Sequence, residues 1–157
     1  MLTGSWITSD PETTFRFGEA AGAQARPGET WCLSGTLGAG KTAFIQGLAA
    51  GLGVASRVTS PTFSLQNVYE ARLTLHHFDW YRLEKAAEVI DLGWDEWLGR
   101  GAVVAVEWGD KFPGLFPRGF LNLTFEVMGD NERRLVLTAS TKEAEDRVEE
   151  LIKCWPP

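Results

Sequence analysis

The distribution of apolar positions predicts a domain that contains both strands and helices. Residues 102–106 (Ala-Val-Val-Ala-Val) form an unbroken apolar run, which is typical of a strand buried on both faces of a parallel sheet. Residues 30–33 form a second short apolar run, and apolar residues alternate with polar ones from 121 to 127. The turn-forming residues 129–132 lead back into the apolar stretch 134–137. This last part of the chain is therefore predicted to be an antiparallel hairpin.

Helical patterns separate these strands. Ser9, Pro11 and Glu12 mark the start of a helix that ends near residues 26–28, with Ser9 as the expected N-cap. A second helix is predicted over residues 43–52, and a charged amphipathic helix closes the chain. Between them, residues 62–69 and 73–79 are interpreted as two strands, and short helical pieces follow. These elements predict an α/β fold with three layers, a mainly parallel central sheet and an antiparallel hairpin near the C-terminus.

The strongest chemical signal is a glycine-rich loop. Residues 35–42, Gly-Thr-Leu-Gly-Ala-Gly-Lys-Thr, match G-x-x-x-x-G-K-[ST], with a predicted strand before them and a helix after them. Gly38, Ala39 and Gly40 would turn backbone N–H groups toward phosphate oxygens, and the helix from Lys41 through Ala43 would add its positive end. Lys41 is expected to reach the β- and γ-phosphates and Thr42 to bind Mg²⁺. The loop predicts a P-loop NTPase-like domain.

Such a site also needs a carboxylate near Mg²⁺, and two strands supply a candidate. Asp79 follows the apolar residues 73–78, and Glu107 follows the apolar run 102–106. The more uniformly apolar strand favours Glu107, but the spacing leaves both acids open, and either could simply cap a strand end. Residues 60–62 (Ser-Pro-Thr) lie where NTPases often keep a γ-phosphate sensor, although an ordinary proline turn explains them equally well.

Composition narrows the range of functions. The 157 residues have the length of one domain, so residues 1–157 are interpreted as a single P-loop ATPase domain. Fifteen Lys and Arg against 21 Asp and Glu give a net charge of −6, which argues against a stand-alone nucleic-acid-binding module. No apolar run is long enough to span a membrane and no leader opens the chain, so a cytoplasmic protein is expected. Cys32 and Cys154 lack the close spacing of a metal site.

Four motifs, taken in order, resemble the bacterial TsaE (YjeE) ATPase family, which helps to make threonylcarbamoyladenosine in tRNA. They are residues 38–42, the Ser-Pro-Thr-Phe of 60–63, the His-Phe-Asp of 77–79 with Tyr-Arg-Leu at 81–83, and Glu107–Trp108. The resemblance implies ATP and Mg²⁺ as cofactors, with the metal on Thr42 and Glu107. It further implies that Lys41, Asp79 and Glu107 are catalytic, that Thr62 and Trp108 lie near the nucleotide, and that Arg133 contacts the base side.

The resemblance also implies partners. The family acts with a threonylcarbamoyl-transferase and its inactive paralogue, and reaches tRNA through that complex. Two other functions are consistent with the same glycine-rich loop. A small-molecule kinase would need an acceptor pocket and an arginine-bearing lid, which the sequence does not reveal. A nucleotide-gated interaction module would use hydrolysis only as a reset, and the lack of an N-K-x-D motif favours ATP over GTP.

Overall fold

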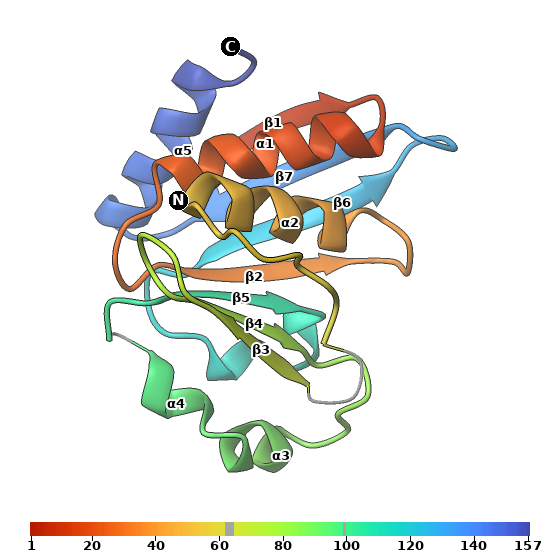
Figure 1. Cartoon of the computed structure of the whole chain (residues 1–157). Coiled ribbons are helices and arrows are strands. Elements are labelled where there is room, and N and C mark those ends of the chain that lie inside the picture. The colour runs from red at the N-terminus through yellow and green to blue at the C-terminus, as the bar shows by residue number, and fades with distance from the viewer. Residues whose placement is uncertain (62–64, 99) are drawn as a thin grey trace.

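The computed structural model describes residues 1–61, 65–98 and 100–157, and its centre is a seven-stranded sheet in the order β1-β7-β6-β2-β5-β4-β3 (Figure 1). The strands are β1 (Leu2–Thr8), β2 (Thr30–Gly35), β3 (Gln66–Tyr69), β4 (Leu75–Asp79), β5 (Val103–Glu107), β6 (Leu121–Val127) and β7 (Arg133–Ala139). The helices are α1 (Pro11–Ala23), α2 (Lys41–Leu52), α3 (Ala86–Asp91), α4 (Trp94–Trp97) and α5 (Lys142–Cys154), with two 3₁₀ turns at Gly109–Lys111 and Pro113–Leu115.

The sheet is mixed, so the predicted mainly parallel sheet is only partly right. Strands β6, β2, β5 and β4 are parallel neighbours, whereas β1 and β7, β7 and β6, and β4 and β3 pair antiparallel. The β6–β7 hairpin is the one predicted from the sequence. The first strand of the chain joins β7 at the opposite end of the sequence, and no local pattern encodes that pairing.

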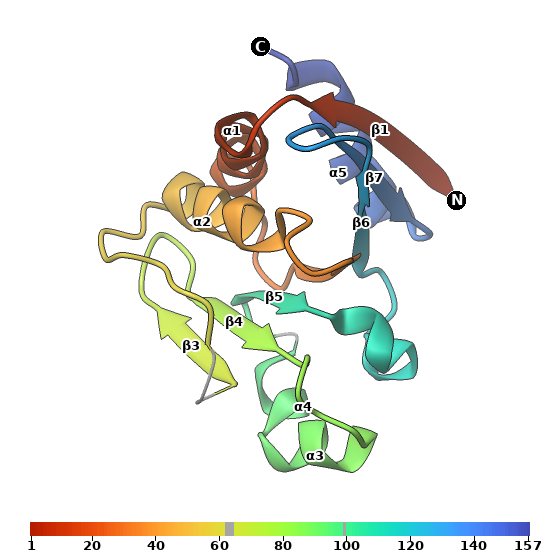
Figure 2. The same ribbon diagram turned by 90° about the vertical axis from the view of Figure 1, so that its right-hand side faces the viewer.

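The helices cover the two faces of the sheet unequally (Figure 2). Helices α1, α2 and α5 pack on one face, over a core that includes Phe17, Phe44 and Leu123. In the described part of the chain, helices α3 and α4 and the 3₁₀ turns cover the other face beside β4, β5 and β2, around Phe78 and Trp94, and Gly109 of the first turn lies close to Cys32 of β2. On that second face the β1 side chains of Thr3, Ser5 and Ile7 are exposed. The three predicted layers therefore exist over one half of the sheet.

Helix α2, which follows the glycine loop, is held very close to α1. The two helices touch through glycines, so that backbone meets backbone. A Cβ atom on Gly47 would lie 1.9 Å from the carbonyl oxygen of Phe15, and one on Gly22 would lie 2.1 Å from that of Leu48. Since a methyl group cannot fit there, the glycines fix the depth at which α2 sits and with it the position of the loop.

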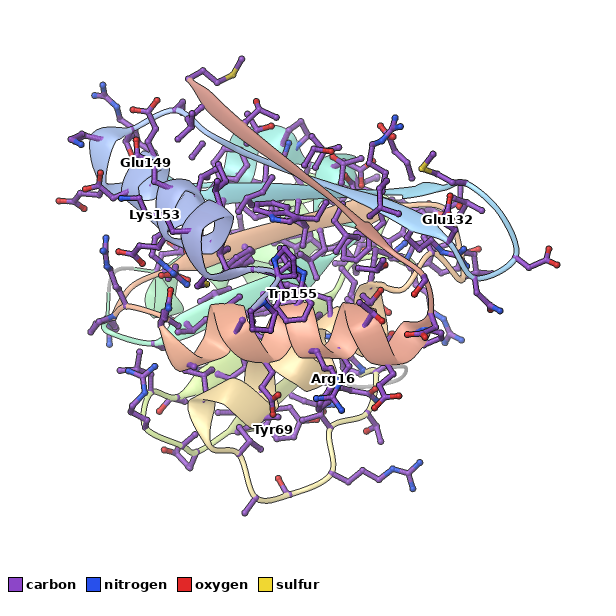
Figure 3. All side chains as sticks on the ribbon, turned by 90° about the horizontal axis from the view of Figure 1, so that it is seen from above. Arg16, Tyr69, Glu132, Glu149, Lys153 and Trp155 are labelled. Carbon is purple, nitrogen blue, oxygen red and sulfur yellow. The ribbon has the colours of Figure 1, made fainter. Side chains whose placement is uncertain are left out.

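The start of α1 differs slightly from its prediction. The N-cap is Asp10 rather than Ser9, because the Asp10 carboxylate accepts the Thr13 N–H at 2.7 Å and the Thr13 hydroxyl at 2.7 Å. Trp155, which follows α5, lies over the middle of α1 (Figure 3), where its ring meets that of Phe17 edge to face. Within the described part of the chain, no helix has the length and apolar character needed to cross a membrane.

Candidate nucleotide-binding site

The glycine loop connects β2 to α2, as the sequence predicts. Gly38 and Gly40 have φ angles of 77° and 108°, in the left-handed region that side chains disfavour. Gly40 is the residue before α2, and no side chain among the described residues caps this helix end. The first-turn N–H groups and the positive end of the helix dipole are thus available to an anion.

A hollow of about 300 Å³ opens beside the loop. It lies at the carboxyl edge of the parallel strands, because β2 leads into the loop while β4 and β5 end beside it. Asp79 is the register partner of Glu107 on the adjacent strand, which brings the two candidate carboxylates together. The lining residues are Leu37, Gly38, Ala39, Gly40, Lys41, Thr42, Ser60, Asp79, Tyr81, Glu107 and Trp108.

Glu107 is the acid that faces the expected metal ligand. Its Oε1 accepts the Thr42 hydroxyl at 3.1 Å, and its Oε2 lies 2.7 Å from Nε2 of His77. Burial disfavours the charged form of Glu107, but the hydrogen bonds from His77 and Thr42 and the charges of His77 and Lys41 outweigh it. The pKa of Glu107 consequently lies below its ordinary value. A lowered pKa favours the ionised carboxylate, which is the form that a hard cation prefers as a ligand.

Asp79 has a different environment. Its Oδ1 accepts the Tyr81 N–H at 2.9 Å, and its Oδ2 accepts the Ser60 hydroxyl at 3.3 Å. Burial raises the pKa of Asp79, and the neighbouring Glu107 charge adds to this, although the hydrogen bonds oppose it. The Ser60 hydroxyl lies between the two acids, because it is also 3.4 Å from Glu107 Oε2; Glu107 differs from Asp79 in its contact with Thr42, and Asp79 differs from Glu107 in its contact with the Tyr81 N–H.

Lys41 is folded back against its own loop. Its Nζ donates to the carbonyl oxygens of Gly35 at 2.5 Å and Thr36 at 3.2 Å, and it lies 3.8 Å from the centre of the Trp108 ring. Burial lowers the pKa of Lys41, while three nearby carboxylates act in the opposite direction. Trp108 itself has φ of 61°, uncommon for a residue with a side chain, and its ring packs against Tyr81.

We expect Trp108 to report nucleotide binding, because the Lys41 ammonium must leave the ring to reach phosphate. Adding MgATP should change the tryptophan emission of the wild type, and Trp108→Phe should abolish that change. Trp6→Phe, in strand β1, should retain it and serves as the control among the seven tryptophans. A nucleotide-dependent change that survives Trp108→Phe would contradict this contact as the source.

Two sequence candidates, Ala43 and Arg133, are not among the residues that line the hollow. Ala43 is in the first turn of α2, behind the loop. The guanidinium of Arg133 donates to the carbonyl oxygens of Ala39 at 3.1 Å and Gly38 at 3.3 Å, and so ties the β6–β7 hairpin to the outside of the loop. Its contact with a base stays a prediction. Thr62 lies outside the described residues.

Sequence reasoning missed two contributions. His77 belongs to the motif of residues 77–79 that carries the resemblance, but the sequence predicts no contact for it, and the structure buries its side chain against Glu107. A signal existed: His77 is two residues before Asp79, and alternate residues of a strand share a face. Leu37 was not singled out either, although its side chain is 76 % exposed at the mouth of the hollow.

The fold and this hollow define a class of protein: an α/β domain with a mixed sheet that carries a phosphate-binding-loop sequence at the carboxyl edge of its parallel strands. The sequence profile of the family described as "Threonylcarbamoyl adenosine biosynthesis protein TsaE" matches residues 8–135. The chain belongs to the TsaE family.

Individual relatives agree with this placement. The protein named tRNA threonylcarbamoyladenosine biosynthesis protein TsaE from Bacillus subtilis is 40% identical over 147 residues, covering 93% of this chain and 92% of the relative. Its namesake from Treponema pallidum is 36% identical over 131 residues, covering 83% and 97%. The crystal structure of Bacillus subtilis YdiB superposes with a TM-score of 0.82 at 33% identity, covering 97% of this chain and 95% of that one.

Proposed function

We propose that this protein binds and hydrolyses ATP with Mg²⁺ as a cytoplasmic component of tRNA threonylcarbamoyladenosine biosynthesis. We further propose that it acts with a threonylcarbamoyl-transferase and that enzyme's inactive paralogue. The observation that carries the proposal is the arrangement of Lys41, Thr42 and Glu107 around one hollow, in a chain whose family is named for this modification.

The residues present fit a magnesium–nucleotide complex. Mg²⁺ is commonly held by one or two protein oxygens together with phosphate oxygens, and Thr42 and Glu107 offer such a pair at the base of the loop. The bound ion would neutralise charge that develops on the phosphates. The loop glycines and the start of α2 would bind phosphate oxygens through backbone N–H groups.

The remaining polar groups would serve hydrolysis. Lys41 would exchange the Gly35 and Thr36 carbonyls for phosphate oxygens. Asp79 accepts hydrogen bonds from the Tyr81 N–H and the Ser60 hydroxyl, which hold its carboxylate at the hollow, and in this proposal it would orient the attacking water.

A partner could read the nucleotide state at the mouth of this hollow. Leu37 in the loop and Tyr81 after β4 both line it, and their side chains are 76 % and 51 % exposed. Tyr81 is linked by its backbone to Asp79, and Leu37 belongs to the loop that would hold phosphate. Movement of either segment on loss of the γ-phosphate would change an apolar surface that a partner protein contacts.

We expect a non-hydrolysable ATP analogue to promote binding to the transferase pair more strongly than ADP does, as measured by calorimetry or surface plasmon resonance. Multiple-turnover modification of tRNA should require this chain with an intact Lys41. Equal affinity in all nucleotide states would argue against nucleotide gating, and full modification without the chain would remove the proposed role. The alternative, a small P-loop kinase, requires phosphate transfer to a small-molecule acceptor without partners.

A further inference from the structure

We propose that His77 is a positioning residue, which holds the Glu107 carboxylate in the orientation that presents one oxygen to the metal beside Thr42. The inference rests on the proposed function, because it assigns a role within the same nucleotide site. It concerns a side chain that lies outside the lining of the hollow and would touch neither nucleotide nor metal.

The contact between the two side chains is short and buried. His77 Nε2 and Glu107 Oε2 are 2.7 Å apart, and the residues are 0 % and 4 % exposed. His77 lies on β4 opposite Ala105 of β5, and two residues further toward the hollow Asp79 pairs with Glu107. The imidazole therefore reaches diagonally from β4 to the carboxylate on the parallel strand β5, two residues nearer the carboxyl ends of the strands.

The two carboxylate oxygens of Glu107 have different hydrogen-bond partners. Oε2 is held by His77, with the Ser60 hydroxyl at 3.4 Å, whereas Oε1 is left on the side of the Thr42 hydroxyl at 3.1 Å. A glutamate side chain has three rotatable bonds, and fixing its far oxygen removes most of that freedom before a metal arrives. This is the arrangement by which groups behind a metal site usually orient carboxylate ligands.

The direction of the hydrogen bond follows from the charge of Glu107. An ionised carboxylate only accepts, so with Glu107 ionised the donor is Nε2 of His77. Nδ1 has no hydrogen-bond partner among the described residues. Within that part of the chain, the imidazole thus makes its one hydrogen bond to Glu107, and the orientation of each side chain depends on the other.

The experiment compares two substitutions of His77. His77→Leu removes the donor at similar volume, whereas His77→Gln keeps an N–H donor that can reach the position of Nε2. Mg²⁺ would be titrated into protein with ATP, with calorimetry and tryptophan emission as readouts, and ATP binding would also be measured in EDTA. Thermal unfolding would show that each variant is folded.

We expect His77→Leu to raise the Mg²⁺ concentration needed at the midpoint by about 10- to 100-fold, the usual cost of losing a group behind a metal ligand. ATP binding in EDTA should stay within about twofold, since Lys41 and the loop would still hold the phosphates. His77→Gln should restore most of the Mg²⁺ affinity. If His77→Leu does not fold, His77→Asn replaces it, because its shorter side chain keeps polarity but falls short of Glu107.

A matched control lies next to His77 on the same strand. His76 is 2 % exposed, points to the other side of β4 and hydrogen-bonds Gln66. His76→Leu should lower thermal stability without moving the Mg²⁺ midpoint. A general disturbance of β4 would instead move the midpoint in both variants.

The outcomes separate this inference from the proposed function. If the wild type binds ATP with Mg²⁺ but His77→Leu leaves the Mg²⁺ midpoint unchanged, the positioning role is wrong and the ATP site stands. Equal losses with Mg²⁺ and in EDTA, or no rescue by His77→Gln, would also overturn it. A wild type that binds no ATP would overturn both.

Discussion

Replacing Lys41 by alanine is expected to weaken binding of ATP with Mg²⁺ by about 100-fold, because hydrogen bonds to charged groups contribute about 1.5–3 kcal/mol. In the structure this ammonium is buried at the loop, and its hydrogen bonds among the described residues go to two backbone carbonyl oxygens. Neutral carbonyl oxygens bind an ammonium more weakly than charged phosphate oxygens would. Hydrolysis should fall with binding, since the same group would face the β- and γ-phosphates.

Isothermal titration and phosphate release would test the Lys41 prediction. Lys111→Ala is the matched control, because Lys111 is an exposed lysine near the same site that donates to the Tyr81 carbonyl at 2.8 Å. Its removal should change ATP affinity by no more than about threefold, since exposed charges contribute little. Unchanged affinity and turnover in Lys41→Ala would refute the phosphate-binding assignment of the loop.

Glu107→Gln should reduce Mg²⁺-dependent hydrolysis by roughly 100- to 1,000-fold, since charge stabilisation by a metal ion contributes several kcal/mol. The amide keeps the shape of the side chain but lacks the charge that a hard cation requires, and it also weakens the acceptor for His77. The chain should still fold, because the substitution removes no volume from the β5 end.

Asp79→Asn is the comparison for Glu107→Gln. It should lower the maximal rate while leaving the Mg²⁺ midpoint near that of the wild type, because Asp79 faces Ser60 and Tyr81 rather than Thr42. Rates measured across a range of Mg²⁺ concentrations would distinguish the two acids. If only Asp79→Asn altered the metal dependence, the roles assigned to the two carboxylates would have to be exchanged.

The elements predicted well are those whose information is local. The glycines of residues 35–42 predict a backbone that other residues disfavour, and Gly38 and Gly40 do have left-handed φ angles in the structure. The hairpin of β6 and β7 follows from alternation interrupted by a turn. The uniformly apolar β5 has a parallel strand on each side, β2 and β4. In each case neighbouring residues suffice, because the period or the turn lies within a few positions.

The polarity of the whole sheet could not be read in the same way. Strand β1 pairs with β7, which lies far away in the sequence: Leu2 is the register partner of Ala139. Strand β3 adds an antiparallel partner to β4. Alternating burial shows that a strand has one covered face, but it does not say which strand lies alongside or in which direction. The prediction of a mainly parallel sheet therefore applies to the strands around β2 and β5 but not to the two ends of the sheet.

By itself, the sequence determined which chemical groups are available: a glycine loop that ends in Lys41 and Thr42, and two carboxylates at the ends of apolar strands. Only the tertiary structure decided which of these groups contact one another. The register of β4 on β5 places Asp79 beside Glu107 and sends His77 diagonally to the Glu107 carboxylate, across 30 positions of sequence. A slip of β4 by one residue would turn His77 and Asp79 to the face of the sheet opposite Glu107. Register is set by packing of the whole sheet against its helices, and for that reason the site depends on the complete fold.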